Sequence, residues 1–162
     1  MSNKPLIVYY SLTGNTKLIA EAIKGVIDAD ILALKPIKEL NPEKSSRYFW
    51  GGYQANMKKK PKLMDLSVDP TRYDTIIIGT PVWAYNYTPA IRSFIAQVTL
   101  ENKKMAVFCC HEGGPGKTLL NLKKDLSGNT IIAENDFLNV AKNKEENIKK
   151  ARQWAMEIKE KL

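Results

Sequence analysis

The sequence contains few of the residues on which disulfide and metal chemistry depend. Its only two cysteines, Cys109 and Cys110, are adjacent, and His111 is the single histidine. This composition excludes an ordinary disulfide framework and the usual four-ligand zinc clusters. Long apolar runs are also absent: the longest span residues 6–10 and 105–110, whereas a membrane helix needs about 18 apolar residues. With no long apolar signal segment at the N-terminus, we expect a cytoplasmic protein without a membrane anchor.

Acidic residues are fewer than basic ones, with 17 Asp and Glu against 25 Lys and Arg, which gives a net charge of +8. Such an excess permits an anionic partner such as nucleic acid, an acidic protein or a phosphorylated ligand. The one dense basic run is 58–62, and elsewhere, as in the tail 144–161, lysines alternate with acids. This interleaving is typical of solvated faces and argues against nucleic-acid binding.

The length of 162 residues predicts a single domain, 1–162, and 44% hydrophobic residues are enough for a substantial core. Apolar runs rich in β-branched and aromatic residues predict five strands, at 6–10, 31–34, 75–79, 105–110 and within 130–140. Apolar residues recur at helical spacing within 18–26, 91–98, 119–126, before a stop at Gly128, and 148–162. This alternation predicts an α/β fold with a parallel sheet covered by helices on both faces.

The crossover 35–73 is the least regular segment, because prolines and a Gly-Gly pair interrupt it. We expect one short helix there, at about 42–57. Its aromatic residues are interpreted as packing on the sheet, and covering a ligand or a partner is the alternative. These residues are Tyr48, Phe49, Trp50 and Tyr53.

In an open parallel sheet, ligands bind beyond the C-terminal ends of the strands, near the point where the strand order reverses. The first predicted strand is followed by the run Ser11-Leu12-Thr13-Gly14-Asn15-Thr16. This run places three hydroxyl groups and free backbone N–H groups at a helix N-terminus, which predicts an anion cradle without a basic residue. The alternative is a Gly-Asn turn with a threonine N-cap.

The third predicted strand leads into an unusually aromatic loop. The loop reads Thr80-Pro81-Val82-Trp83-Ala84-Tyr85-Asn86-Tyr87. Three aromatic residues in five positions suit stacking on a flat conjugated ligand, with aromatic packing or a protein interface as the alternatives. Thr88 and Pro89 then predict the N-cap and first turn of the next helix.

The fourth predicted strand is followed by a glycine-rich loop. It reads Cys110-His111-Glu112-Gly113-Gly114-Pro115-Gly116. Glycines let the backbone approach a ligand closely, so this loop is expected to present N–H and C=O groups to the polar edge of a ring. The three loops together suggest a phosphorylated flat heterocycle as the ligand.

At this point the sequence resembles the flavodoxin family of FMN-binding proteins, over nearly the whole chain. The most specific element is Ser11-x-Thr13-Gly14-Asn15-Thr16, which is similar to the phosphate loop of the family. The run Gly79-Thr80-Pro81-Val82-Trp83 is similar to its first flavin loop, and Glu112-Gly113-Gly114 lies where its second should be. One departure is Ala84-Tyr85-Asn86, at a place where many flavodoxins have a glycine.

The resemblance implies a three-layer sandwich with a five-stranded parallel sheet in the order 2-1-3-4-5, and FMN as the cofactor. It assigns Ser11, Thr13, Asn15 and Thr16 to the phosphate. Trp83 or Tyr85 would flank the ring, and backbone at 110–114 would meet its pyrimidine edge. The remaining residues of the three loops, Leu12, Gly14, Thr80, Pro81, Val82, Ala84, Asn86, Cys110, His111, Glu112, Gly113 and Gly114, are predicted to complete the cofactor site.

The favoured function is therefore a flavodoxin-type electron carrier, and an NAD(P)H-dependent FMN quinone reductase of the same fold is the alternative. Family carriers are typically acidic, whereas this chain has a net charge of +8. A redox partner protein is thus expected to present an acidic docking face. The sequence leaves the oligomeric state open.

Two other motifs suggest different functions, a P-loop-like nucleotide triphosphatase and a thiol-redox protein. Gly116-Lys117-Thr118 follows a predicted strand and is similar to the end of a P-loop, although His111 stands where the first glycine of that motif should be. The pair Cys109-Cys110 invites a thiol-redox function, but the C-x-x-C spacing is absent. We interpret one or both cysteines as buried strand-end residues beside the flavin site.

Overall fold

The structure, a computed structural model, describes residues 4–39 and 60–162. The helix expected at about 42–57 and its four aromatic residues lie outside the described residues. In chain order the elements are β1 (Leu6–Tyr9), α1 (Asn15–Lys24), β2 (Asp30–Ala33), the 3₁₀ turn η1 (Pro70–Arg72), β3 (Thr75–Trp83), β4 (Asn86–Tyr87), α3 (Pro89–Gln97), β5 (Lys104–His111), α4 (Thr118–Asp125), β6 (Thr130–Leu138) and α5 (Lys144–Lys159).

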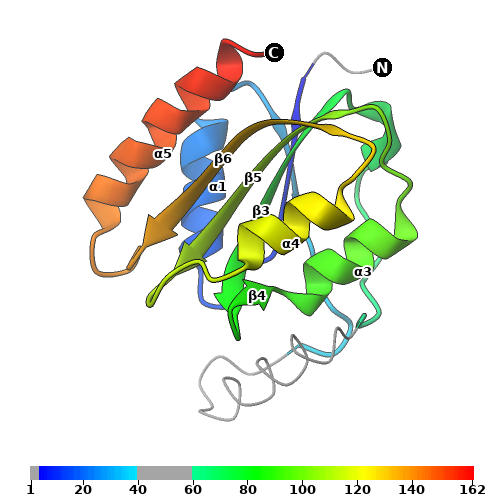
Figure 1. The fold of residues 1–162 in the computed structure, drawn as a ribbon, viewed down its shortest axis with the longest axis horizontal. Coiled ribbons are helices and arrows are strands. Elements are labelled where there is room, and N and C mark those ends of the chain that lie inside the picture. Colours follow the sequence, from blue (N-terminus) through cyan, green and yellow to red (C-terminus); the bar gives the residue numbers. More distant parts are fainter. Residues whose placement is uncertain (1–3, 40–59) are drawn as a thin grey trace.

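Five strands form a parallel sheet in the order β2-β1-β3-β5-β6, and β4 pairs antiparallel with the end of β3 (Figure 1). With β4 set aside, this is the order 2-1-3-4-5 that the resemblance implied, so the expected fold is confirmed. The short strand β4 was not predicted, and β3 continues past Gly79 to Trp83. The extension forms because Val82 and Trp83 pair with Tyr87 and Asn86 in a hairpin.

Each face of the sheet carries its own apolar core. Side chains alternate between the faces along a strand, so Leu6 and Val8 lie in one core, whereas Ile7 and Tyr9 lie in the other. The first core is covered by α3 and α4, and the second by α1 and α5 (Figure 1). This is the helix-covered sandwich that the alternation of segments predicted.

The predicted apolar stripe of the last helix is confirmed for most of its members. Ala151, Trp154, Ala155 and Ile158 are buried in the core between α1, α5 and the sheet. Leu162 is the exception, because it follows the end of α5 and is 45% exposed.

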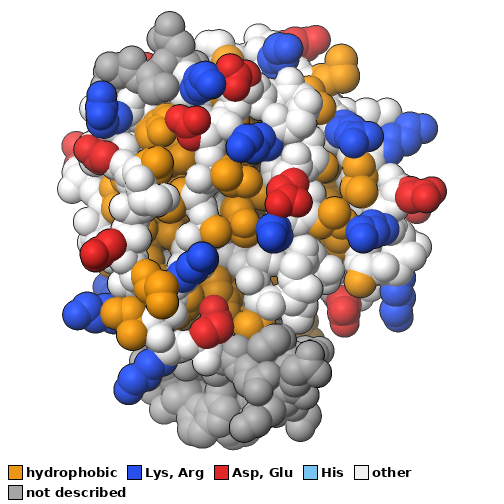
Figure 2. Space-filling view, turned by 180° about the vertical axis from the view of Figure 1, so that it is seen from behind, with side chains coloured by type: hydrophobic (Ala, Val, Ile, Leu, Met, Phe, Trp, Pro, Cys, Tyr) orange, Lys and Arg blue, Asp and Glu red, His pale blue; other side chains and the backbone are white. Residues whose placement is uncertain are grey.

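Charged side chains of both signs are interspersed on the molecular surface, as the sequence predicted. Figure 2, which views the molecule from behind, shows Lys and Arg among Asp and Glu, with apolar atoms visible between them. Lys17 and Glu21 on α1 are one such pair, 3.9 Å apart. None of the helices in the described parts of the chain is long and apolar enough to cross a membrane.

β3 and β5 pack tightly against each other at Gly79. A Cβ atom on this residue would lie 2.1 Å from Cζ of Phe108. The Phe108 ring is fully buried and packs edge-on against Phe137 and Trp154, with both ring centroids 5.9 Å away. The ring therefore has no space into which it can retreat.

We predict that Gly79→Ala lowers the free energy of unfolding by about 3 kcal/mol, because the added methyl group overpacks a closed core. Urea denaturation followed by circular dichroism measures this change. Gly25→Ala is the matched control: its Cβ would meet backbone atoms at 3.5 Å or more, and its φ of −65° suits any residue. Equal stability of the two variants would contradict the packing argument.

Candidate functional site

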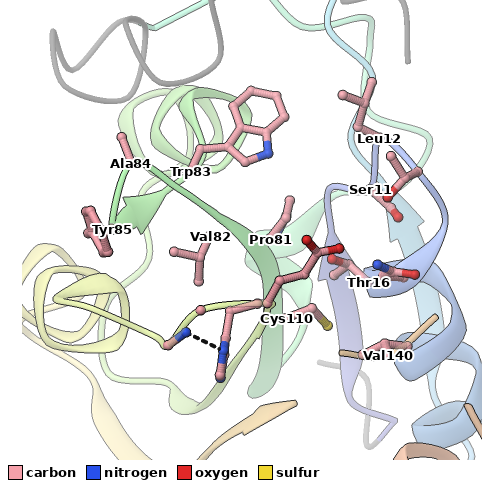
Figure 3. Close-up of a pocket in the computed structure, with 16 residues that line it drawn as sticks. Ser11, Leu12, Thr16, Pro81, Val82, Trp83, Ala84, Tyr85, Cys110 and Val140 are labelled. Atoms are coloured by element: carbon pink, nitrogen blue, oxygen red, sulfur yellow. Dashed lines mark hydrogen bonds between the residues drawn. The ribbon is translucent and has the colours of Figure 1, made fainter. Parts of the chain in front are cut away.

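A cavity of about 390 Å³ lies at the C-terminal edge of the sheet, where the loops after β1, β3 and β5 meet. This volume is within the range of small-molecule and cofactor sites. Figure 3 shows Ser11 and Thr16 on one side of the cavity, Ala84 and Tyr85 on the other, and Cys110 between them. The lining consists of Ser11, Leu12, Thr13, Asn15, Thr16, Pro81, Val82, Trp83, Ala84, Tyr85, Cys110, His111, Glu112, Gly113, Gly114 and Val140.

The cavity brings together every predicted site residue except Gly14, Thr80 and Asn86. Thr80 is fully buried, and its hydroxyl lies 3.2 Å from the hydroxyl of Thr88. Sequence reasoning missed Val140, which follows β6 and lines the cavity from a fourth strand end. Its only signal was its position at the end of the segment 130–140, in which the last strand was predicted.

The first loop leaves the N-terminus of α1 uncapped. The helix starts at Asn15, and Gly14 occupies the N-cap position with a φ of 100°, so the threonine N-cap that we considered does not form. The Ser11 hydroxyl instead accepts a hydrogen bond from the Gly14 N–H at 3.1 Å. The first turn contains no acidic residue. Its N–H groups and the positive end of the helix dipole therefore favour an anion here.

The second loop is a tight hairpin with two strained residues. Ala84 and Tyr85 connect β3 to β4 and have φ values of 49° and 62°. This is the two-residue turn that glycine and asparagine usually occupy, and a left-handed conformation costs about 1–2 kcal/mol for each other residue. The neighbouring Trp83 packs edge-on against Tyr10, with ring centroids 5.5 Å apart. Tyr85, which is 73% exposed, is the aromatic side chain at the rim of the cavity.

The hairpin is held in place by one stripe of α4. Three consecutive residues of the hairpin form hydrogen bonds with three residues of α4. The α4 residues are four positions apart, so they lie on one side of the helix: the first is the N-cap residue, and the others follow one and two helical turns later. We refer to this set as the α4 ladder. Its hydrogen bonds run from the Lys117 N–H to the Tyr85 carbonyl at 3.1 Å, from Asn121 Nδ2 to Asn86 Oδ1 at 3.2 Å, and from the Tyr87 hydroxyl to Asp125.

The segment that resembled the end of a P-loop takes part in this docking. Gly116 approaches the hairpin so closely that a Cβ atom would lie 2.7 Å from Tyr85 Cβ, and its φ is 54°. Lys117 supplies the first hydrogen bond of the α4 ladder through its backbone. The Thr118 side chain is fully buried, so its hydroxyl is not presented at the cavity. In this structure the Gly-Lys-Thr run therefore packs against the aromatic hairpin and forms a hydrogen bond with it.

The third loop is braced by His111, the last residue of β5. Its Nδ1 atom accepts a hydrogen bond from the Gly114 N–H at 2.9 Å, shown as the dashed line in Figure 3. Its Nε2 atom lies 2.6 Å from Oδ2 of Asp136 on β6. The imidazole therefore links the loop to the edge strand of the sheet.

Both cysteines are buried at the end of β5, as the sequence predicted. Cys110 lines the cavity, and burial raises the pKa of its thiol to about 12. Burial also raises the pKa of the Cys109 thiol far above its ordinary value. Among the residues that the structure describes, no group of His, Cys, Asp and Glu could hold a metal ion.

The sheet order and the cavity at its C-terminal edge define the class of the protein: an α/β sandwich with a flavodoxin-like fold. The sequence profile described as Flavodoxin matches residues 4–156. The chain therefore belongs to the flavodoxin family. No curated protein sequence matches it.

Solved structures of flavoproteins share the fold. A flavoprotein from Lactobacillus acidophilus NCFM in complex with FMN is 24% identical, with a TM-score of 0.71 over 89% of this chain and 98% of that chain. The apo form of the flavoprotein from the same organism is 26% identical, with a TM-score of 0.63 over 88% and 97%. Oxidised flavodoxin 2 from Bacillus cereus is 20% identical, with a TM-score of 0.63 over 99% and 100%.

We predict that neither thiol reacts readily in the native protein. Because burial raises the pKa of Cys110 to about 12, its thiolate fraction at pH 8 is far below that of an ordinary cysteine. Alkylation by iodoacetamide at pH 8 should be at least about 100-fold slower in native than in urea-unfolded protein. Cys109→Ser and Cys110→Ser variants assign the rates, and a native rate equal to the unfolded one would revive the thiol-redox hypothesis.

Proposed function

We propose that this chain binds FMN noncovalently in the edge cavity and works as a flavodoxin-type electron carrier. The observation that carries the proposal is the convergence of three loops on one cavity. An uncapped helix N-terminus lies on one side of it and an exposed tyrosine on the other. Such an arrangement suits a ligand that is anionic at one end and flat and aromatic at the other.

The first loop would hold the phosphate group. Ser11, Thr13 and Thr16, which all carry hydroxyl groups, line the cavity beside the N-terminus of α1. A hydrogen bond to a charged group contributes about 1.5–3 kcal/mol. Neutral hydroxyls and backbone N–H groups can therefore bind a dianion without a lysine or arginine in the loop.

The second and third loops would hold the ring. Tyr85 and Trp83 offer aromatic surface from the hairpin, and the backbone at 110–114 offers N–H and C=O groups to a polar edge. Pro81, Val82 and Val140 make part of the wall apolar, which limits the access of water. When bound, FMN supplies the one- and two-electron chemistry, and these residues orient it and set its electrostatic surroundings. An apolar wall disfavours added negative charge on the ring, whereas nearby lysines favour it.

The proposal includes a protein redox partner with an acidic docking face, because the chain has a net charge of +8. Lys117 is an exposed basic residue whose backbone N–H binds the carbonyl of Tyr85, the tyrosine at the rim of the cavity. The proposal also includes a cytoplasmic location, a compartment in which free cysteines persist.

The decisive experiment is the visible absorption spectrum of the purified protein, before and after addition of FMN and removal of the excess. We expect flavin bands to remain, and stepwise anaerobic reduction to pass through a one-electron form. Steady-state oxidation of NADH or NADPH with a quinone acceptor should be absent. Direct two-electron bleaching together with rapid NAD(P)H oxidation would favour the quinone reductase. Loss of all flavin after reconstitution would overturn the proposal, and ATP binding that depends on Lys117 would then be tested.

We predict that Thr13→Ala and Thr16→Ala each weaken FMN binding by about 10- to 100-fold, the equivalent of about 1.5–3 kcal/mol. Riboflavin lacks the phosphate, so its affinity should change by less than about twofold. Fluorescence titration measures both dissociation constants. Thr130→Ala, at an exposed position at the start of β6, is the matched control. Equal losses for FMN and riboflavin would show that the first loop does not hold the phosphate.

A further inference from the structure

His111 is the only histidine of the chain, and it lines the cavity. Its side chain is only 5% exposed. The two ring nitrogens have different partners on different elements, Gly114 in the third loop and Asp136 on β6. No role proposed so far for the cavity uses this side chain.

The partners fix the protonation state of the imidazole. A backbone N–H can only donate, so the hydrogen bond from Gly114 requires an unprotonated Nδ1. The hydrogen of the neutral ring is then on Nε2, which donates it to the Asp136 carboxylate at 2.6 Å. His111 is therefore neutral, in a single tautomer, in this conformation of the loop.

The part of the loop that His111 holds has little other support. A Cβ atom placed on Gly113 or Gly114 would meet no atom within 4 Å, so packing does not confine this segment. Gly114 has a φ of 119°, a conformation that only glycine adopts readily. The hydrogen bond to Nδ1 is thus the contact that selects the direction of the Gly114 amide.

We propose that His111 is a positioning residue for the flavin. Anchored by Asp136, it holds the Gly113–Gly114 peptide in the orientation that meets the ring, and protonation of Nδ1 releases this peptide. The inference rests on the proposed function, because the peptide matters only if the cavity binds a flavin. His111 acts through the loop and does not itself react.

Protonation creates a direct conflict in the observed geometry. A second proton on the ring would sit on Nδ1 and face the Gly114 N–H, so two donors would oppose each other. The acidic groups next to the ring are the Asp136 carboxylate, 2.6 Å from Nε2, and Glu112, the next residue in the loop. A basic group lies on the same side, because Lys150 Nζ of α5 donates to the Asp136 carbonyl at 2.5 Å. The protonated ring can pair with Asp136 only if the hydrogen bond between the Gly114 N–H and Nδ1 breaks.

The first measurement needs neither a variant nor a cofactor. In the apo protein, the amide resonance of Gly114 should shift between pH 8 and pH 5.5 along the same titration curve as the His111 ring protons. Amide exchange at Gly114, corrected for its intrinsic pH dependence, should become faster over the same interval. A Gly114 amide that does not respond while His111 titrates would overturn the proposal.

The second measurement uses riboflavin as the probe, because it has no phosphate that titrates in this interval. We expect its dissociation constant for the native protein to rise at least fivefold from pH 8 to pH 5.5. In His111→Asn the amide Oδ1 can replace Nδ1 as the acceptor, and this side chain does not gain a proton in this interval, so the riboflavin dissociation constant of the variant should not depend on pH.

His111→Gln tests the other hydrogen bond. Its longer side-chain amide can replace Nε2 as the donor to Asp136, but it leaves the Gly114 N–H without an acceptor. Its riboflavin affinity should be at least fivefold weaker than native at pH 8. Thermal denaturation establishes that the variants are folded.

The outcomes separate the two proposals. Failure of the native chain to bind FMN at any pH would contradict the proposed function itself. Flavin binding that is independent of pH, or a His111→Asn variant that retains the native pH dependence, would overturn the role of His111 and leave the proposed function intact.

Discussion

The cavity depends on one constraint: after the adjacent strands β1 and β3, the chain leaves toward opposite faces of the sheet. From β1 the chain enters α1, which covers one face of the sheet, whereas α3, which follows β3 and its hairpin, covers the other. Adjacent strands whose connections leave in opposite directions cannot close the space above their ends. The cavity occupies this space, and the loop after β5 closes a third side. Connection geometry therefore decides which residues can reach a ligand.

On both sides of the cavity the chain has residues or conformations that lower local stability. A serine or aspartate N-cap would stabilise α1 by only about a few tenths of a kcal/mol relative to glycine, yet Gly14 occupies the N-cap and no side chain caps the helix. Across the cavity, Ala84 and Tyr85 adopt a left-handed conformation that glycine would tolerate better. Strain and unsatisfied groups accumulate where a ligand or a functional geometry compensates for them. The well-packed sheet between the two sides compensates for the stability that is lost at the N-cap of α1 and in the hairpin.

The fold was predictable because buried parallel strands have continuous apolar sequences and helices have their own period. The loops were predictable because hydroxyls, aromatics and glycines cluster there. The hairpin strand β4 was not, since Pro81 and the short run Asn86–Tyr87 give no strand signal without their tertiary pairing. Thr80 shows a different limit of the sequence, because a threonine at a strand end looks the same whether its hydroxyl faces a ligand or, as here, contacts Thr88. The pairing of His111 with Asp136, 25 residues away, also depends on β5 and β6 being neighbours.

The α4 ladder limits how this region can change in evolution. Two residue steps of a strand advance about 6.7 Å, whereas eight residues of a helix advance about 12 Å. The ladder bridges this difference because its hairpin partners reach progressively further, from a backbone carbonyl at Tyr85 through the amide of Asn86 to the phenol of Tyr87. An insertion or deletion between β5 and α4 would shift the helix against the hairpin and break all three hydrogen bonds together. The three hydrogen bonds therefore constrain the length of that connection, and we expect Asn86 and Tyr87 to change in step with their helix partners.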